Sequence, residues 1–225
     1  MIMKKFLLTL TLFTITTITP SENPNPYTIK VLTPEQMKPL LPFVANLRVN
    51  IFRNYPYLYD GNIAEEMENL EKYAQHNNSA LAIAYCNETP VGFLCGSDLM
   101  HYSVHFENSI EDLFKSGNLH AKNYYYCADI IILPEHRGKY LAPQLFDAIE
   151  NYAQQKGYTA SCFITEHHEN HPLKPHDHKS LVPLWNNLNY QKSALITYAT
   201  WQTYQLDGTI KSEQHPLIFW LKTLK

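Results

Sequence analysis

The chain has 225 residues, of which 45% are hydrophobic and 13% aromatic, and its formal net charge is -3. A chain of this length and composition can bury one good core, and its length does not require a second folded domain. No run of Lys or Arg exceeds two residues, which argues against a nucleic-acid footprint and against a basic surface for membrane docking. We therefore expect a small partner and no nucleic acid.

Residues 1–26 resemble a secretory signal. A basic start precedes an apolar, Thr-rich run at residues 6–18, and a linker-like stretch rich in Pro, Asn and Ser follows at residues 19–26. The apolar run is too short to span a bilayer comfortably, so we predict no stable membrane span. No Ala-x-Ala cleavage site follows it, so whether the segment is cleaved stays open. We expect a cytoplasmic location, with export as the alternative.

The first part of the chain is expected to alternate strands and helices. Apolar residues at helical spacing, with Leu40, Leu41, Val44 and Leu47 facing inward, predict a helix over residues 34–52. In order, the expected elements are a strand at 27–32, this helix, a second helix at 62–76, and two strands at 80–86 and 91–95 that a turn at 87–90 joins.

Three tyrosines alternate in the segment between the two helices, at Tyr55, Tyr57 and Tyr59. If this segment is extended, two-residue spacing points all three rings to one side and makes an aromatic wall with hydroxyls, suited to an amine or an aromatic acceptor. The alternative is a loop that pins itself to the core with its rings.

The four cysteines lie inside or at the edge of apolar strand-like runs, without CxxC spacing. They are Cys86, Cys95, Cys127 and Cys162. We predict buried, reduced thiols, and the alternative is a disulfide between Cys86 and Cys95 across the hairpin.

The most informative stretch runs from Tyr124 to Tyr158. Residues 124–133 form a near-continuous apolar strand that Pro134 closes, and from Ala142 onward apolar residues follow the period of a helix, which Gly157 ends. Between them lies a basic loop, residues 136–141. Backbone amides at a helix N-terminus, backed by the loop's two cations, suit a phosphate or pyrophosphate.

The remaining expected elements are a short helix at 110–116, a strand at 160–165, a short helix at 181–188 and a long strand at 194–205. The long C-terminal strand and the apolar stretch at 216–221 could supply a sheet edge shared in a homodimer.

The strand, the proline and the loop Arg137-x-x-Tyr140-x-Ala142 resemble the central signature of the GCN5-related N-acetyltransferases, the GNAT family. The resemblance covers residues 27–220 in the order and length of the elements. It implies an α/β fold with a central mixed sheet and helices on both faces, one acetyltransferase domain over residues 27–225, and acetyl-CoA as co-substrate. The residues it places against acetyl-CoA are Ile131, Ile132, Leu133, His136, Arg137, Gly138, Lys139, Tyr140, Leu141 and Ala142.

Asp129 is the first candidate for a catalytic base. It interrupts an apolar strand, where a carboxylate is costly unless a cleft or a partner accommodates it, and the family places a base or a water-positioning carboxylate here. Acetyl transfer needs a neutral amine, which a nearby base provides. The alternative is a structural Asp bonded to its neighbours. In the family, the segment of Tyr55, Tyr57 and Tyr59 forms part of the acceptor wall.

Two positions depart from the family pattern. Tyr140 occupies the first glycine position of the signature, and Trp185 stands where many relatives carry a tyrosine that acts as general acid. An indole cannot donate that proton.

Five histidines crowd into one segment, at His167, His168, His171, His176 and His178. The segment lacks a helical His-x-x-x-His frame, so we interpret it as a solvated loop and predict no metal site. The loop borders the acceptor site in the resemblance, so His168 or His171 could act as acid or base. The sequence thus predicts N-acetyl transfer to a small-molecule or peptide amine; the alternative is a non-catalytic, exported relative that binds a ligand or metal through this loop.

Overall fold

The computed structural model describes residues 25–166 and 171–225. Their centre is one mixed sheet of seven strands in the order β1-β2-β3-β4-β5-β7-β6. The strands are β1 (Tyr27–Leu32), β2 (Ala80–Cys86), β3 (Thr89–Asp98), β4 (Tyr124–Ile132), β5 (Ala160–Glu166), β6 (Gln191–Tyr204) and β7 (Ile210–Thr223). Neighbours in this sheet pair antiparallel, except β4 and β5, which are parallel.

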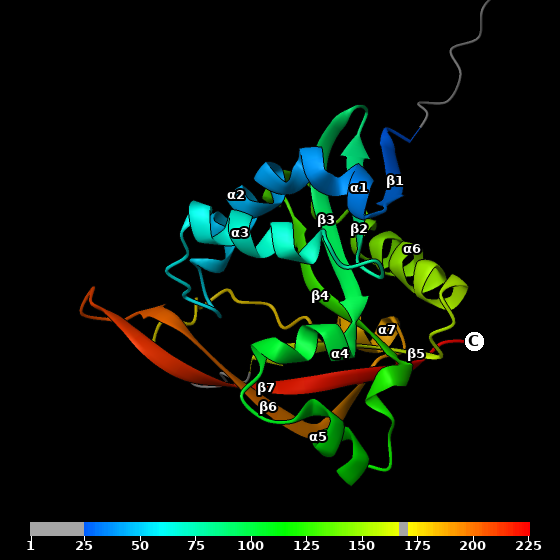
Figure 1. Ribbon diagram of the computed structural model, residues 1–225. Helices are drawn as coiled ribbons and strands as arrows, with labels where there is room; N and C mark the ends of the chain where they lie inside the picture. The colour runs from blue at the N-terminus through cyan, green and yellow to red at the C-terminus, as the bar shows by residue number, and fades with distance from the viewer. Residues whose placement is uncertain (1–24, 167–170) are drawn as a thin grey trace, which may run out of the picture.

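Helices cover both faces of the half of the sheet formed by β1 to β4 (Figure 1). The helices are α1 (Pro34–Met37), α2 (Leu41–Phe52), α3 (Ile63–Tyr73), α4 (Leu99–Tyr102), α5 (Ile110–Ser116), α6 (Leu141–Gln155) and α7 (Val182–Asn187). Short 3-10 turns are η1 (Lys38–Leu40), η2 (Ser103–His105), η3 (Ala121–Asn123) and η4 (Pro134–His136).

Strand β2 shows how the sequence builds this sandwich. Its successive side chains point to opposite faces: Ala82 and Ala84 belong to the core that α6 covers, and Leu81 and Ile83 to the core under α2 and α3. Both faces are buried, so the strand reads as a continuous apolar run rather than an alternating one.

The sheet opens between β4 and β5. These two strands pair only at Tyr124 with Ala160, Tyr125 with Ser161 and Tyr126 with Cys162. Beyond that point β4 continues beside β3, and β5 continues beside β7, so the two halves of the sheet diverge (Figure 1). One edge of β4 is therefore left without a neighbouring strand.

A bulge lies in β4 at this divergence. Leu94 pairs with Ile130 and Gly96 with Cys127, so Ala128 and Asp129 both stand opposite the single residue Cys95. An extra residue in one strand bends the strand and redirects its side chains. This bulge allows both Ala128 and Asp129 to face the opening.

The connection between β3 and β4, residues 99–123, is far longer than an antiparallel pair requires. It contains α4, η2, α5 and η3, and its Leu99, Ile110 and Phe114 pack in one cluster with Phe219 of β7 and Leu195 of β6. In Figure 1 this green segment lies over β6 and β7. The insertion therefore attaches to the second half of the sheet and forms a wall of the opening.

The fold class and the predicted order of elements are confirmed, with one strand missed. The stretch at 216–221 lies inside β7, between β5 and β6, so the expectation that it supplies a sheet edge was wrong. The long strand predicted at 194–205 lies in β6, which is an edge strand of the sheet. All four cysteines are free. The alternative disulfide was wrong because Cys86 pairs with Thr89 near the turn, whereas Cys95 pairs with Leu81 toward the other end of the hairpin.

The signal-like segment lies almost entirely outside the described residues, which begin at Asn25. Among the residues that the structure describes, no helix has the length and apolar character needed to cross a membrane.

Candidate active site

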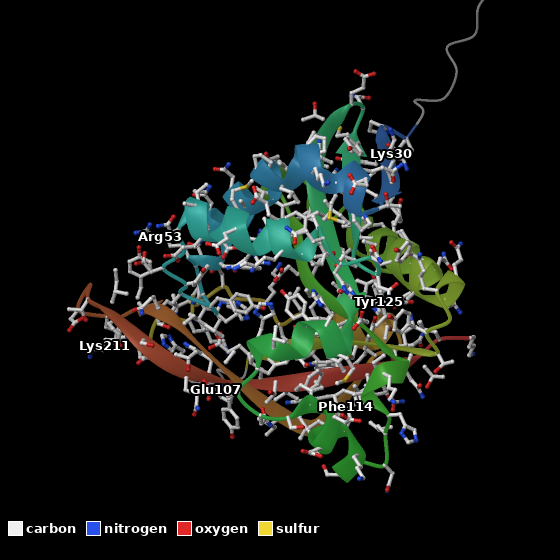
Figure 2. All side chains as sticks on the ribbon, in the orientation of Figure 1. Lys30, Arg53, Glu107, Phe114, Tyr125 and Lys211 are labelled. Atoms are coloured by element: carbon white, nitrogen blue, oxygen red, sulfur yellow. The ribbon has the colours of Figure 1, made fainter. Side chains whose placement is uncertain are left out.

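A cavity of about 500 Å³ occupies the opening between the two halves of the sheet. Volumes of this order suit small-molecule ligands. Its walls come from β4, β5, β6 and β7, from α2 and α3, from the α4–η2 insertion, and from the loop between α2 and α3. Figure 2 shows side chains of both halves projecting into the space between α3 and the β6–β7 hairpin.

The floor of the cavity carries a charged network. Arg48 of α2 donates from Nη1 to Asp129 of β4, and its Nε lies 2.6 Å from Glu66 Oε2 of α3. The hydroxyl of Tyr59 donates to the other oxygen of Glu66 at 2.8 Å. The side chain of Glu66 is only 2% exposed, whereas those of Asp129 and Arg48 are 15% and 18% exposed. Of the three charged members of this network, Asp129 and Arg48 are therefore the ones that a ligand can reach more readily.

Arg48 was missed by the sequence reading, although a signal for it exists. It lies four residues after Val44 on the inward face of α2, and residues four apart share a helix face. A cation on an otherwise apolar face requires a buried anion, and Glu66 and Asp129 both meet that need.

The electrostatics of Asp129 suit a base. Burial raises the pKa of its carboxyl, the Arg48 guanidinium opposes that rise, and nearby Glu66 adds to it. A raised pKa makes a carboxylate a stronger base near neutral pH, and the guanidinium favours its ionised form.

The three predicted tyrosines do not share one side. Tyr57 and Tyr59 line the cavity, whereas the ring of Tyr55 packs against that of His178 at 4.9 Å. The segment is a loop, as in the alternative, and is not extended: Leu58 N donates to Asn54 O at 3.1 Å, so the chain turns there and breaks the two-residue alternation.

Two histidines among the described residues line the main cavity, and neither was predicted. His168 lies outside the described residues, and His171 lines a separate hollow beside Tyr204, where its Nδ1 accepts from Leu173 N at 3.1 Å. His101 and His105 of the insertion line the main cavity instead, and burial lowers the pKa of both. Within the described ranges, no group of three His, Cys, Asp or Glu side chains is arranged to hold a metal ion.

Trp185 belongs to the core. It is 6% exposed and packs against the ring of Phe163 at 4.8 Å. Two tyrosines elsewhere in the chain, Tyr57 and Tyr102, line the cavity, and burial raises the pKa of both hydroxyls. Both hydroxyls keep their protons at neutral pH. The cavity therefore contains hydroxyl groups that can donate a proton, although Trp185 cannot.

The free edge of β4 leads to the N-terminus of α6. Leu133 N donates to Val91 O at 2.9 Å, so the backbone N–H and C=O groups of Leu133 point to β3. Backbone groups alternate in direction along a strand, so those of Ile131 also point to β3. The backbone groups of Ile130 and Ile132 point the other way, to the opening. Arg137 Nε donates to Ile132 O at 3.0 Å, in agreement with this alternation. The amides of Ile130 and Ile132, next to Ile131 and Leu133, are therefore the ones that β3 leaves free for a ligand.

The loop before α6 contains two residues with a left-handed backbone conformation. Gly138 has φ 72°, and Tyr140, the N-cap residue of α6, has φ 60° and is 71% exposed. Residues 138–142 thereby bring the first amides of a 15-residue helix to the end of β4. The positive φ explains why the family signature has a glycine at the position of Tyr140, because glycine adopts this φ without strain.

This geometry predicts how substitution at Tyr140 affects stability. Tyr140→Gly should be more stable than Tyr140→Ala by about 1 kcal/mol, because alanine keeps the left-handed strain and glycine removes it. Thermal unfolding of the two variants measures the difference. As a control, the same pair at Gln144, a helical position of α6, should rank in the opposite order.

Comparison with known proteins decides the family. Residues 47–175, more than half of the chain, match the model of the Acetyltransferase (GNAT) family. The chain belongs to this family. The GNAT fold is also found in YncA from Salmonella typhimurium, solved with its cofactor acetyl-CoA, at 14% identity and a TM-score of 0.56 over 89% of this chain and 95% of that one.

Two further solved structures share the fold. An N-acetyltransferase from Staphylococcus aureus Mu50 matches at 16% identity and a TM-score of 0.54, over 88% of this chain and 99% of that one. A ribosomal-protein-alanine N-acetyltransferase from Brucella melitensis matches at 12% identity and a TM-score of 0.56, also over 88% and 99%. No curated protein sequence matches the chain.

As a GNAT member, the protein is an acyltransferase that uses acetyl-CoA as its co-substrate. The free edge of β4 and the N-terminus of α6 fit this donor, since unpaired strand amides suit a thioester arm and the first amides of a helix suit a pyrophosphate. Family membership favours an enzyme over the non-catalytic alternative. GNAT enzymes act on small-molecule or peptide acceptors.

Proposed function

We propose that this protein transfers the acetyl group of acetyl-CoA to a primary amine of a small molecule or peptide, by direct attack of the amine on the thioester. One observation carries the proposal: the β4 bulge turns Asp129 into the cavity at the point where the free edge of β4 begins. A carboxylate then lies beside the strand that would hold the thioester.

The donor would lie along β4 and the following loop. The amides of Ile130 and Ile132 would hold the pantetheine arm, and a free strand amide would polarise the thioester carbonyl. Arg137, Lys139 and the first amides of α6, around Leu141 and Ala142, would hold the pyrophosphate. His136 lies at the edge of this loop, where its Nδ1 is 3.1 Å from the hydroxyl of Tyr27.

In the reaction, Asp129 would accept a proton from the acceptor ammonium, directly or through a water molecule. The neutral nitrogen would attack the carbonyl carbon, forming the N–C bond as the C–S bond breaks. The departing thiolate would take its proton from the hydroxyl of Tyr57 or Tyr102. The resulting tyrosinate would recover a proton, directly or through a water molecule, from the nitrogen that has attacked, so the amide leaves neutral. No covalent enzyme intermediate is needed, which suits a cavity whose nearest thiol, Cys95, has a pKa raised by burial.

The donor is a cytosolic metabolite, so we place the activity in the cytoplasm and treat residues 27–225 as one catalytic domain. The seven-stranded sheet runs through almost all of that range, which supports this boundary. Residues 216–221 would not supply a strand edge for a homodimer, because β7 has a neighbouring strand on each side.

The pyrophosphate assignment predicts a selective defect. Arg137→Ala should raise the KM for acetyl-CoA about tenfold, in line with one charge-assisted contact, and leave kcat within about twofold. Release of the CoA thiol, followed colorimetrically at varied acetyl-CoA, measures both constants. Lys211→Ala on the β6–β7 hairpin removes a cation far from this loop and serves as the control (Figure 2). An unchanged KM in Arg137→Ala would remove Arg137 from the donor site.

A further inference from the structure

Trp201 of β6 forms a fixed aromatic wall of the cavity. Its Nε1 donates to the backbone oxygen of Tyr57 at 3.0 Å, which holds the indole in one orientation. Its ring stacks on the ring of His215 of β7, with centroids 3.6 Å apart and planes 2° apart. The part of the indole that His215 leaves uncovered lines the cavity.

His215 is itself held on both sides. Its Nδ1 bonds to the carboxylate of Glu166, and its Nε2 lies 2.8 Å from Thr203 Oγ1. The residue is only 3% exposed. Since neither ring nitrogen is free to turn elsewhere, His215 is a rigid backing, and Trp201 is preorganised as a flat surface before any ligand enters.

The rest of the cavity repeats this aromatic character. Besides Trp201, the partly exposed rings that line it are Phe52, Tyr57, Tyr59, Tyr102 and Phe106. The floor network holds one formal positive charge, on Arg48, and two negative charges, on Asp129 and Glu66, which leaves one net negative charge. A negative floor below aromatic walls attracts a cation that carries an apolar, flat body.

We propose that the acceptor is a small primary amine on a planar aromatic body, which stacks against Trp201 while its amino group reaches Asp129. This assignment rests on the proposed function, and it narrows the acceptor from any small molecule or peptide to an arylalkylamine. The two recognition elements differ: Trp201 selects the body, and Asp129 receives the amine.

The test uses the full chain, acetyl-CoA and three matched amines: 2-phenylethylamine, 2-cyclohexylethylamine and n-hexylamine. We expect the KM for 2-phenylethylamine to be about tenfold below that for n-hexylamine, because one aromatic contact contributes about this factor. Trp201→Leu should raise the KM for the aryl amine about tenfold and change that for n-hexylamine less than about twofold, whereas Trp201→Phe should keep the preference.

Tyr198→Leu is the matched control, since it removes an exposed ring from the same strand outside the cavity. Equal KM values for the aryl and alkyl amines in the wild type, or a preference that survives Trp201→Leu, would overturn the aromatic-body assignment and leave acetyl transfer intact. Calorimetric titration of each amine into the protein with CoA separates the two proposals. Aryl-selective binding that Trp201→Leu abolishes, without acetylation of any amine, would support the acceptor assignment and refute the proposed reaction.

Discussion

Replacing Asp129 with asparagine should lower kcat for acetyl transfer by about 100-fold or more, within the range typical of a lost general base. The carboxamide keeps the shape of the side chain and loses its capacity to accept the ammonium proton. Arg48 retains Glu66 as an ion-pair partner, so the floor of the cavity should keep its arrangement. The loss should therefore appear in turnover rather than in folding.

The rate deficit of Asp129→Asn should depend on pH in a defined direction. Without Asp129, the reaction draws on the fraction of amine that is already neutral, which rises with pH toward the amine's own pKa of about 10. The rate deficit of Asp129→Asn should therefore be largest near pH 6 and shrink toward pH 9.5. In the wild-type enzyme, activity should fall as acid protonates Asp129, and it should fall at a higher pH than for an ordinary carboxyl, because burial raises the pKa of this one.

Thiol release measured between pH 6 and 9.5 tests both statements. Asp147→Asn is the control, since Asp147 is an exposed carboxylate of α6 outside the cavity. Circular dichroism establishes that each variant is folded. A folded Asp129→Asn enzyme that works at full rate at pH 6 would leave Asp129 with a structural role alone.

Local patterns in the sequence predicted the donor side of this enzyme. The strand at 124–133, Pro134, the basic loop and the start of the helix near Ala142 are contiguous, and each has its own signal: apolar strand formers, a ring that ends a ladder, and helical periodicity. The interruption of that strand by Asp129 was also visible in the sequence. The residues proposed to hold acetyl-CoA therefore follow from one stretch of chain.

The proposed acceptor side could not be predicted in this way, because it is assembled from distant segments. Arg48 meets Asp129 across 81 positions, and Trp201 meets Tyr57 across 144. Tyr102 belongs to an insertion that the sequence did not connect with the cavity. Where two segments meet depends on the divergence of β4 from β5 and on the bulge at Asp129, which are properties of strand pairing and register.

The left-handed residues show a second limit. Tyr140 was noted as a departure from a glycine position, but the sequence gives no reason why the backbone there needs a positive φ. Likewise Leu58, at φ 49°, takes part in the turn that separates Tyr55 from Tyr57 and Tyr59. A non-glycine residue in this region is uncommon, so the alternation of three tyrosines could not decide between an extended segment and the loop that the fold contains.

Replacing Arg48 with methionine should lower the free energy of unfolding at pH 8 by about 3 kcal/mol, near the lower end for a broken buried ion pair because Arg48 is partly exposed. Methionine fills much of the space of the arginine stem, so the loss would come from charge. Asp129 and Glu66 would then face each other without a cation. Arg53→Met, at the exposed C-cap of the same helix, is the matched control and should cost less than about 1 kcal/mol, since it removes only the contact of the guanidinium with the ring of Tyr204.

The deficit of Arg48→Met should depend on pH in a defined direction. Loss of the guanidinium removes the charge that opposes the effect of burial, so the folded-state pKa of Asp129 should rise further above its unfolded value. An acid with a raised folded pKa contributes stability that is present below the unfolded pKa and lost as pH rises through the folded pKa. Urea unfolding should therefore show a smaller deficit at pH 5 than at pH 8.

Adding Asp129→Asn to Arg48→Met should recover part of the stability at pH 8, since it removes one of the two unpaired carboxylates. A deficit that is equal at both pH values and unaffected by Asp129→Asn would mean that Arg48 stabilises the fold by packing its stem, and that its charge does not set the ionisation of Asp129.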